Sequence, residues 1–291
     1  MEVMFMALTE TYTLANGVQI PVIGFGTWQS ADGDVAYDAV KWALEAGYRH
    51  IDTAAIYGNE ASVGRAIKDS GIARDELFVT TKLWNDAHSY TAAKAALATS
   101  LETLGLDYVD LYLIHWPNPA AVQEQGPQAW EQANAETWRA MEEAYADGQV
   151  RAIGVSNFQI HHLEALAKTQ KIAPMVNQSF LNPSDEQAEL VAYDKAHNIL
   201  DEAYSPLGTG KLVHLPQVAD LAAKYGKSVP QILIRWSLEK GFLPLPKSTH
   251  QAYIQANLDV FDFSLTPEDM ATLDALQGVG GAHTEPDTAN F

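Results

Sequence analysis

Four side chains that can donate, accept or hold a proton stand at or just beyond the ends of apolar segments. Asp52 ends "YRHID", Lys82 ends "LFVTTK", His115 ends "VDLYLIH", and Tyr57 follows Asp52 in the next loop. A free tyrosine has a pKa near 10 and is a poor acid at neutral pH. A nearby ammonium stabilises the phenolate and lowers that pKa, so Lys82 could activate Tyr57 for proton exchange with a substrate oxygen. Asp52 would keep Lys82 charged and oriented, and His115 could hydrogen-bond the same oxygen.

Each of these four residues also has an ordinary structural explanation. An Asp–Lys pair at a strand end is often only a buried ion pair, and a single histidine is more often structural than catalytic. For any one residue the structural explanation is the better one. Four such groups on neighbouring segments, however, make coincidence a poor account of the pattern.

The segments that would position these residues alternate regularly along the chain. Stretches of helical periodicity, such as residues 35–46, 92–104 and 136–146, separate short apolar and β-branched runs. The eight runs are "VIGFGT", "YRHIDT", "LFVTTK", "VDLYLIHW", "RAIGVS", "MVNQS", "ILDEAYS" and "FLPLPK". This alternation predicts a (β/α)8 TIM barrel, whose C-terminal strand ends meet at the mouth where such barrels build active sites. A doubly wound sheet would need a third glycine after "GFG" at residues 24–26.

Other local signals refine this architecture. Asn16-Gly17 between two strand-like runs predicts a β-hairpin, which we expect at the bottom of the barrel. The intervals 118–149 and 207–241 are too long for single helices and predict long loops at the barrel ends. Ser184 and Gln187 match a capping box that would start a helix in "SDEQAEL". Because no composition shift marks a boundary, residues 1–291 are expected to form one domain.

The composition excludes several classes of partner. A formal charge of −19 would repel nucleic acid and anionic membranes. The chain has no cysteine and therefore no disulfide or Cys-ligated zinc. The start "MEVMFMALTE" lacks a basic region and a long apolar core, so no signal peptide is expected, and its methionines leave the start codon ambiguous. No run of about 18 apolar residues occurs, and we expect a cytoplasmic protein without a membrane span.

Several short segments, in a fixed order, resemble those of the aldo-keto reductase family, in particular bacterial members with a short C-terminal tail. They are "GFGTW", "HIDTAAIYGNE", "TKLW", "IHWP", "IGVSNF", "VNQ", "AYSPLG" and "PKS", and the resemblance runs from about Gly17 to the C-terminus. It implies an (α/β)8 barrel that binds NADP(H) without a Rossmann motif and reduces aldehydes or ketones to alcohols. It further implies that Tyr57 is the general acid, supported by Lys82 and Asp52, with His115 positioning the carbonyl. Hydride would come from the nicotinamide.

The same resemblance assigns binding residues. Ser156, Asn157 and Gln178 match positions that hold the nicotinamide carboxamide, and Tyr204 matches the one that stacks on the ring. Aromatic walls of the substrate pocket, which His115 also lines, are expected at Trp28, Trp84 and Trp116. The expected cofactor contacts are Thr27, Ser156, Asn157, Gln178, Tyr204, Ser205, Leu207, Gly208, Lys247, Ser248, Tyr253 and Asn257.

One part of the chain departs from the family pattern. Lys247 and Ser248 match positions that grip the 2′-phosphate of NADPH, but Tyr253 stands where many relatives carry an arginine that pairs with this phosphate. No Lys or Arg follows Lys247 in the chain. A lost charged hydrogen bond costs about 1.5–3 kcal/mol, roughly a 10- to 150-fold loss of affinity. We therefore expect NADPH to be used with a weak preference, and NADH to be used as well.

Two rival functions stay open at this point. One is a non-catalytic barrel that binds the cofactor as a sensor or structural subunit, and the other is an aldolase that forms a Schiff base on Lys82. The intact set of four polar residues argues against the first. The expected partner is a small-molecule carbonyl compound, and nothing demands more than a monomer.

Three further signals are given no catalytic role. "SPLGTGKL" fails the phosphate-loop pattern twice. Adjacent His161 and His162 lack the i, i+4 spacing of a helical metal pair, so we expect solvated side chains and no metal site. The tail "GAHTEPDTANF" is expected to pack at the barrel mouth.

Overall fold

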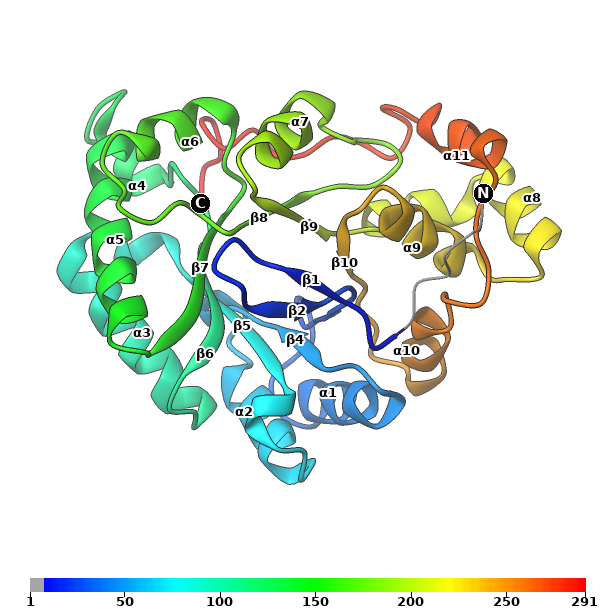
Figure 1. The fold of residues 1–291 in the computed structure, drawn as a ribbon, viewed down its shortest axis with the longest axis horizontal. Helices are drawn as coiled ribbons and strands as arrows, with labels where there is room; N and C mark the ends of the chain where they lie inside the picture. Colours follow the sequence, from blue (N-terminus) through cyan, green and yellow to red (C-terminus); the bar gives the residue numbers. More distant parts are fainter. Residues whose placement is uncertain (1–7) are drawn as a thin grey trace.

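The structure, a computed structural model, describes residues 8–291. The first seven residues, where the start codon is ambiguous and no signal peptide is expected, lie outside the described residues. Eight parallel strands form one sheet whose order follows the chain (Figure 1). The strands are β3 (Phe25–Gly26), β4 (His50–Asp52), β5 (Phe78–Leu83), β6 (Val109–Ile114), β7 (Val150–Ser156), β8 (Val176–Phe180), β9 (Leu200–Tyr204) and β10 (Leu243–Leu245).

The first and last strands meet and close the sheet into a barrel. The amide of Gly24 donates to the carbonyl oxygen of Pro244 at 3.1 Å, and Gly26 donates to Pro246 at 3.1 Å. A Cβ atom on Gly24 would lie 2.6 Å from Nδ1 of His50, so only glycine allows this close approach. The predicted (β/α)8 barrel is confirmed, with all eight predicted strands in their expected order.

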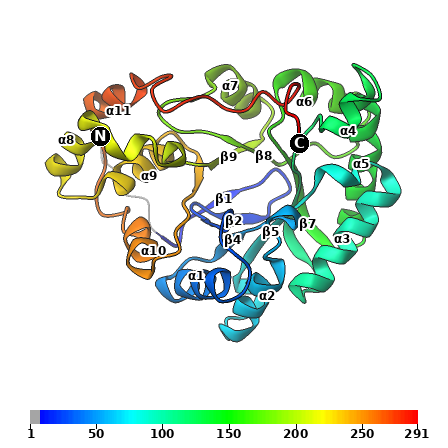
Figure 2. The same cartoon turned by 180° about the vertical axis from the view of Figure 1, so that it is seen from behind.

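Helices surround the ring of strands on its outside (Figures 1 and 2). Because a parallel barrel is covered by helices outside and filled by side chains inside, its strands are buried on both faces. Every residue of β5, β6 and β8 is buried accordingly. The helices are α1 (Asp34–Ala46), α2 (Glu60–Asp69), α3 (Tyr90–Leu104), α4 (Ala120–Gln123), α5 (Ala129–Ala146), α6 (Ile160–Ala167), α7 (Ala188–Ala196), α8 (Pro216–Tyr225), α9 (Val229–Glu239), α10 (Gln251–Leu258) and α11 (Pro267–Asp274).

The predicted hairpin closes the N-terminal end of the barrel. Its strands, β1 (Thr11–Thr13) and β2 (Gln19–Pro21), pair antiparallel and cross the centre of the ring in Figure 1. The Tyr12 hydroxyl donates to the carbonyl of Phe242, and the Asn16 side chain donates to that of Arg151. Both carbonyls lie where strands begin, which puts the hairpin at the bottom. Gly17 has a φ of 87°, the left-handed conformation that the turn requires.

Loops and the C-terminal tail cover the opposite end. The two long intervals, 118–149 and 207–241, each begin with a loop and continue into helices. The first contains α4 and α5, and the second contains α8 and α9. The predicted capping box at Ser184 is wrong, since α7 begins only at Ala188. The Ser184 hydroxyl instead bonds the Asn182 side chain and the carbonyl of Gly281, which belongs to the tail. Among residues 8–291, no helix is long and apolar enough to span a membrane.

Candidate active site

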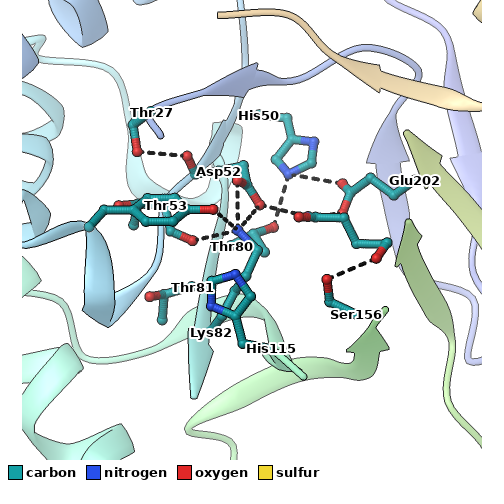
Figure 3. Close-up of polar contacts among 12 residues, drawn as sticks. Thr27, His50, Asp52, Thr53, Thr80, Thr81, Lys82, His115, Ser156 and Glu202 are labelled. Carbon is teal, nitrogen blue, oxygen red and sulfur yellow. Dashed lines mark hydrogen bonds and ion pairs between the residues drawn. The ribbon is translucent and has the colours of Figure 1, made fainter. Parts of the chain in front are cut away.

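The ends of β4 and β5 bring Asp52 and Lys82 into direct contact (Figure 3). The Nζ atom of Lys82 donates to both carboxylate oxygens of Asp52, at 2.8 and 2.9 Å, and to the carbonyl of Thr53 at 2.9 Å. It also lies 3.3 Å from the Tyr57 hydroxyl. Because β4 and β5 are neighbouring parallel strands, their C-terminal ends lie side by side and place Asp52 next to Lys82. The 3-10 turn η1 (Ala55–Tyr57) brings Tyr57 back over the same mouth.

The protonation of this group differs in part from the sequence-based expectation. Burial raises the pKa of Tyr57, and the Lys82 charge opposes this rise without cancelling it. The net pKa of Tyr57 is therefore raised, not lowered. For Lys82, burial lowers the pKa, but Asp52 and Tyr57 more than offset it, so that the pKa is raised and the ammonium stays charged. At neutral pH, Tyr57 is a neutral phenol in contact with a cation.

His115 follows β6 and faces the same space. Its ring centroid lies 5.8 Å from that of Tyr57 and 5.1 Å from that of Trp84, both in edge-on arrangements. Burial and the Lys82 charge hold the pKa of His115 well below its usual range, so the imidazole is neutral. A neutral imidazole can hydrogen-bond a substrate oxygen without adding a second cation.

A cavity of about 860 Å³ opens over these residues. The three tryptophans expected in the substrate wall line it, together with Phe291 from the tail. The Phe291 ring stacks on Trp84 at a centroid distance of 6.4 Å and meets Trp116 edge-on at 4.8 Å. The tail therefore packs at the barrel mouth, as expected from the sequence. Large apolar rings around the Tyr57 hydroxyl would exclude water from it.

The ends of β7, β8 and β9 form the opposite wall of the cavity. Ser156, Asn157, Gln178 and Tyr204 all line it, and the Tyr204 hydroxyl donates to the Asn157 side chain at 2.8 Å. Asn157 in turn donates to the His115 carbonyl at 2.9 Å. Asn157 and Ser205 have φ values of 60° and 50°. Strained backbone of this kind gathers at functional sites, where the surrounding structure holds it.

Not every expected cofactor residue reaches the cavity. Ser205, Leu207 and Lys247 line it. Thr27 is fully buried, and its hydroxyl donates to the Asp52 carbonyl. The others lie outside the cavity lining, in the loop after β9 and on or before α10: Gly208, Ser248, Tyr253 and Asn257.

Sequence reasoning missed several residues at this site. Lys211 lines the cavity but was given no role, because it lies in the dismissed "SPLGTGKL" segment. Phe291 also lines the cavity; the tail was expected at the barrel mouth, but this residue was not singled out. Glu202 is buried inside the barrel beneath the cavity, beside Gln178. The sequence could have indicated Glu202, because an acidic residue inside a predicted barrel strand needs a polar partner when it is buried.

The expectation that His161 and His162 are solvated is wrong for His162. His162 is fully buried, and both rings contact Asp287 of the tail, at 2.8 Å from His161 and 3.0 Å from His162. The candidate ligand atoms lie within 4.8 Å of one another. However, the Gln159 amide donates to Nδ1 of His162, so Nε2 carries the ring proton and donates to Asp287. A metal bound to Nε2 would need the other tautomer, with the proton on Nδ1. Instead, the two histidines hold Asp287 and so attach the tail to α6.

Comparison with known proteins gives consistent matches over nearly the whole chain. A sequence profile of the Aldo/keto reductase family matches residues 22–277. The glyoxal reductase of Bacillus subtilis is 46% identical over 285 residues, covering 98% of this chain and 99% of that protein. An aldo-keto reductase structure from a Medee basin deep-sea metagenome library has a TM-score of 0.90 and 45% identity, covering 97% of this chain and all of that one. A Bombyx mori aldo-keto reductase in complex with NADP has a TM-score of 0.84 and 39% identity, covering 94% of each chain.

Proposed function

This chain belongs to the aldo/keto reductase family, and we propose that it reduces aldehydes or ketones to alcohols with NADPH or NADH. Its family and relatives support an oxidoreductase that acts on carbonyl compounds. The observation that carries the specific proposal is the contact of the Lys82 ammonium with both Asp52 and the Tyr57 hydroxyl, directly beneath an aromatic cavity.

The residues present fit a nicotinamide dinucleotide. Hydroxyl and amide side chains at the ends of β7 and β8 lie on the wall opposite the tryptophans, where they would hold the carboxamide. Lys211 and Lys247 are the lysines that line the cavity, and they supply the local cations that phosphates need in a chain of net charge −19. The Bombyx mori relative was solved with NADP, which supports the same class of cofactor here. When bound, the reduced nicotinamide supplies the hydride.

The protein itself would handle the proton. Tyr57 keeps its proton at neutral pH because burial raises its pKa, so it can donate to the carbonyl oxygen as negative charge develops there. Lys82 then lies 3.3 Å from the phenolate that forms and stabilises it. Neutral His115 would orient the same carbonyl oxygen from the other side.

The charged, hydrogen-bonded state of Lys82 argues against the aldolase alternative. A Schiff-base lysine must lose its proton to attack a carbonyl. Here the pKa of Lys82 is raised by Asp52 and Tyr57 in spite of burial, and Nζ contacts four oxygen atoms from three residues, Asp52, Thr53 and Tyr57. Borohydride trapping with substrate should therefore leave Lys82 unmodified.

The test is a panel of carbonyl compounds with NADPH and NADH in parallel, followed by the loss of reduced-nicotinamide absorbance. Glyoxal opens the panel because a relative carries the name glyoxal reductase, and aromatic aldehydes test the tryptophan wall. We expect turnover with at least one aldehyde and both cofactors. Tight cofactor binding without turnover on any substrate would favour the sensor alternative instead.

A further inference from the structure

Glu202 is a buried carboxyl group to which the proposed reaction gives no role. It lies on β9, directly across from Gln178 of β8 in the parallel register, and its side chain is fully buried. Oε2 accepts a hydrogen bond from Gln178 Nε2 at 2.7 Å. Oε1 has no hydrogen-bond partner among the described residues, and Nε2 of His50 lies 3.6 Å away (Figure 3).

This contact, together with one from Asp52, determines how the Gln178 amide is turned. Nε2 of Gln178 donates to Glu202 Oε2 and to Asp52 Oδ2, the second at 2.8 Å. A primary amide has two N–H donors, and both are thus engaged by carboxyl groups inside the barrel. Exchanging the amide N and O would set an oxygen against the charged carboxylate of Asp52, and it would require a neutral Glu202 to carry its proton on Oε2. The orientation is therefore fixed, and Oε1 is left as the acceptor of a residue that lines the cavity.

Charge balance explains how two carboxyl groups can share one amide in a buried site. Burial, and then the charge of Asp52, raise the pKa of Glu202 to about 8. At neutral pH Glu202 is a neutral acid, while Asp52 and Lys82 carry opposite charges that cancel. A protonated Oε1 leaves Oε2 as a carbonyl oxygen, which is the acceptor that Gln178 needs. The other ionisable neighbour from β4, His50, is also neutral because burial lowers its pKa to about 3.

We propose that Glu202 is a positioning residue for cofactor binding. By accepting one of the two Gln178 N–H groups, it turns the Gln178 carbonyl oxygen toward the cavity, where it accepts a hydrogen bond from the amide of the cofactor carboxamide. The inference rests on the proposed nicotinamide-dependent function. It predicts discrimination against cofactors that lack an amide N–H at this position.

The experiment compares binding of three ligands to three proteins by titration of intrinsic tryptophan fluorescence. The ligands are NADPH, its acetylpyridine analogue in reduced form, which has a ketone and no N–H, and adenosine 2′,5′-bisphosphate, which has no nicotinamide. The proteins are wild type, Glu202→Leu and Glu202→Gln. Leucine removes the acceptor at similar volume, whereas glutamine mimics the neutral acid and keeps an acceptor oxygen. Glu202→Gln is therefore the matched control.

We expect the wild type to bind NADPH about 2- to 12-fold more tightly than the analogue, the range of one neutral hydrogen bond. In Glu202→Leu this ratio should fall toward one through weaker NADPH binding, with the bisphosphate unaffected, and Glu202→Gln should keep the wild-type ratio. A wild type that binds NADPH and the analogue equally well overturns the inference without any variant. So does a Glu202→Leu protein that keeps the ratio, or one that weakens all three ligands alike. Failure of the wild type to bind any nicotinamide cofactor would instead overturn the proposed function itself.

Discussion

At the scale of single residues, the site sets the half-buried phenol of Tyr57 against the buried ammonium of Lys82. Burial raises the pKa of Tyr57, and Lys82 limits that rise because its charge favours the phenolate. The balance suits a group that must hold its proton until a substrate oxygen takes it. Each of the two residues can be tested by a change that alters one part of this balance.

The Tyr57→Phe variant removes the hydroxyl and keeps the ring. We expect turnover to fall by about 10²-fold or more, the scale of general acid catalysis, while the affinity for NADPH stays within about twofold, because no cofactor role is assigned to this hydroxyl. Steady-state kinetics and a fluorescence titration measure the two quantities. If the variant kept near-wild-type turnover, Tyr57 would not be the general acid.

The Lys82→Met variant removes the charge that holds down the pKa of Tyr57. Alcohol oxidation needs the phenolate as a base, so its rate rises as pH passes the pKa of Tyr57. We expect the midpoint of this pH–rate profile to move to higher pH in the variant, with a lower rate at neutral pH. Lys82→Arg, which keeps a cation, is the control and should move the midpoint less. An unchanged profile in Lys82→Met would leave Lys82 with a structural role only.

At the scale of elements, we propose that α10 recognises the adenosine end of the cofactor. Tyr253 projects from its first turn and is 63% exposed, free to stack on an adenine. Lys247, just before the helix, lines the cavity, and its Nζ donates to the Gln29 carbonyl. Lys211, in the loop after β9, also lines the cavity. It is a second cation near the site, although no Lys or Arg follows Lys247 in the chain.

We predict that Tyr253→Arg raises the NADPH/NADH ratio of kcat/KM by roughly 10- to 150-fold, the value of a charged hydrogen bond. The change should come from a lower KM for NADPH, since NADH has no 2′-phosphate. Tyr253→Gln, a neutral control, should leave the ratio near that of the wild type. A wild-type preference for NADPH above about 10³-fold would mean that another residue, for which Lys211 is the candidate, already binds the phosphate.

A second element-scale feature is a pair of carboxyl groups, one in the last turn of α7 and the other near the start of β9. Asp194 and Asp201 are both buried, and Asp194 accepts a hydrogen bond from Asn177 at 2.9 Å. Burial raises the pKa of both groups, and the charge of Asp194 raises that of Asp201 further. The folded protein therefore retains protons that the unfolded chain releases near pH 4.

This pair makes stability depend on pH in a defined direction. Since the folded state binds more protons than the unfolded state above pH 4, the pair favours folding at low pH and this contribution is lost as pH rises through the folded pKa values. We predict that Asp201→Asn raises the melting temperature at about pH 8 by at least ~2 °C, equivalent to roughly 1 kcal/mol. The gain should shrink toward pH 5. Asp220→Asn, on the exposed face of α8, is the control, and an equal shift there would contradict the assignment.

At the scale of the whole molecule, the tail crosses the C-terminal end of the barrel (Figure 2). Several tail residues, Phe291 among them, line the cavity. The tail is fastened at two places by side chains from distant parts of the chain. His283 contacts Asp185 at 2.7 Å, and Asp287 contacts the two histidines of α6 and the Asn118 side chain. Phe291 is thereby held over the tryptophans.

We predict that Phe291→Ala raises KM for aromatic aldehydes by about 2- to 12-fold, the value of one aromatic contact, with little effect on glyoxal, which is too small to reach this ring. Asp287→Ala should act in the same direction because it releases the tail. Asn290→Ala, an exposed tail residue with no hydrogen bond from its side chain among the described residues, is the control. Equal effects on both substrate classes would mean that the tail supports the fold rather than the pocket.

Much of this architecture could be read from local sequence patterns. Strand runs and amphipathic stretches have periods that a few neighbouring residues determine, and parallel barrel strands always end at the same mouth. Asp52, Lys82 and His115 could therefore be placed together from their positions at strand ends, and Tyr57 from the short loop after Asp52. The capping box at Ser184 failed because the chain makes a turn there instead of starting a helix. The Asp185 amide donates to the Asn182 carbonyl, and the Ser184 hydroxyl donates to the Asn182 side chain and to the carbonyl of Gly281 in the distant tail.

The sequence by itself determined the barrel, its hairpin base and the mouth at which the polar residues gather, because these follow from local periodicity. Only the tertiary structure decided the properties that depend on burial and on contacts between distant segments. Burial reversed the expected direction of the Tyr57 pKa shift, and it made His162 a fastening for the tail. The shared use of the Gln178 amide by Asp52 and Glu202 likewise exists only across the closed barrel. Desolvation and hydrogen-bond geometry are set by everything that packs around a group, and no local pattern encodes that environment.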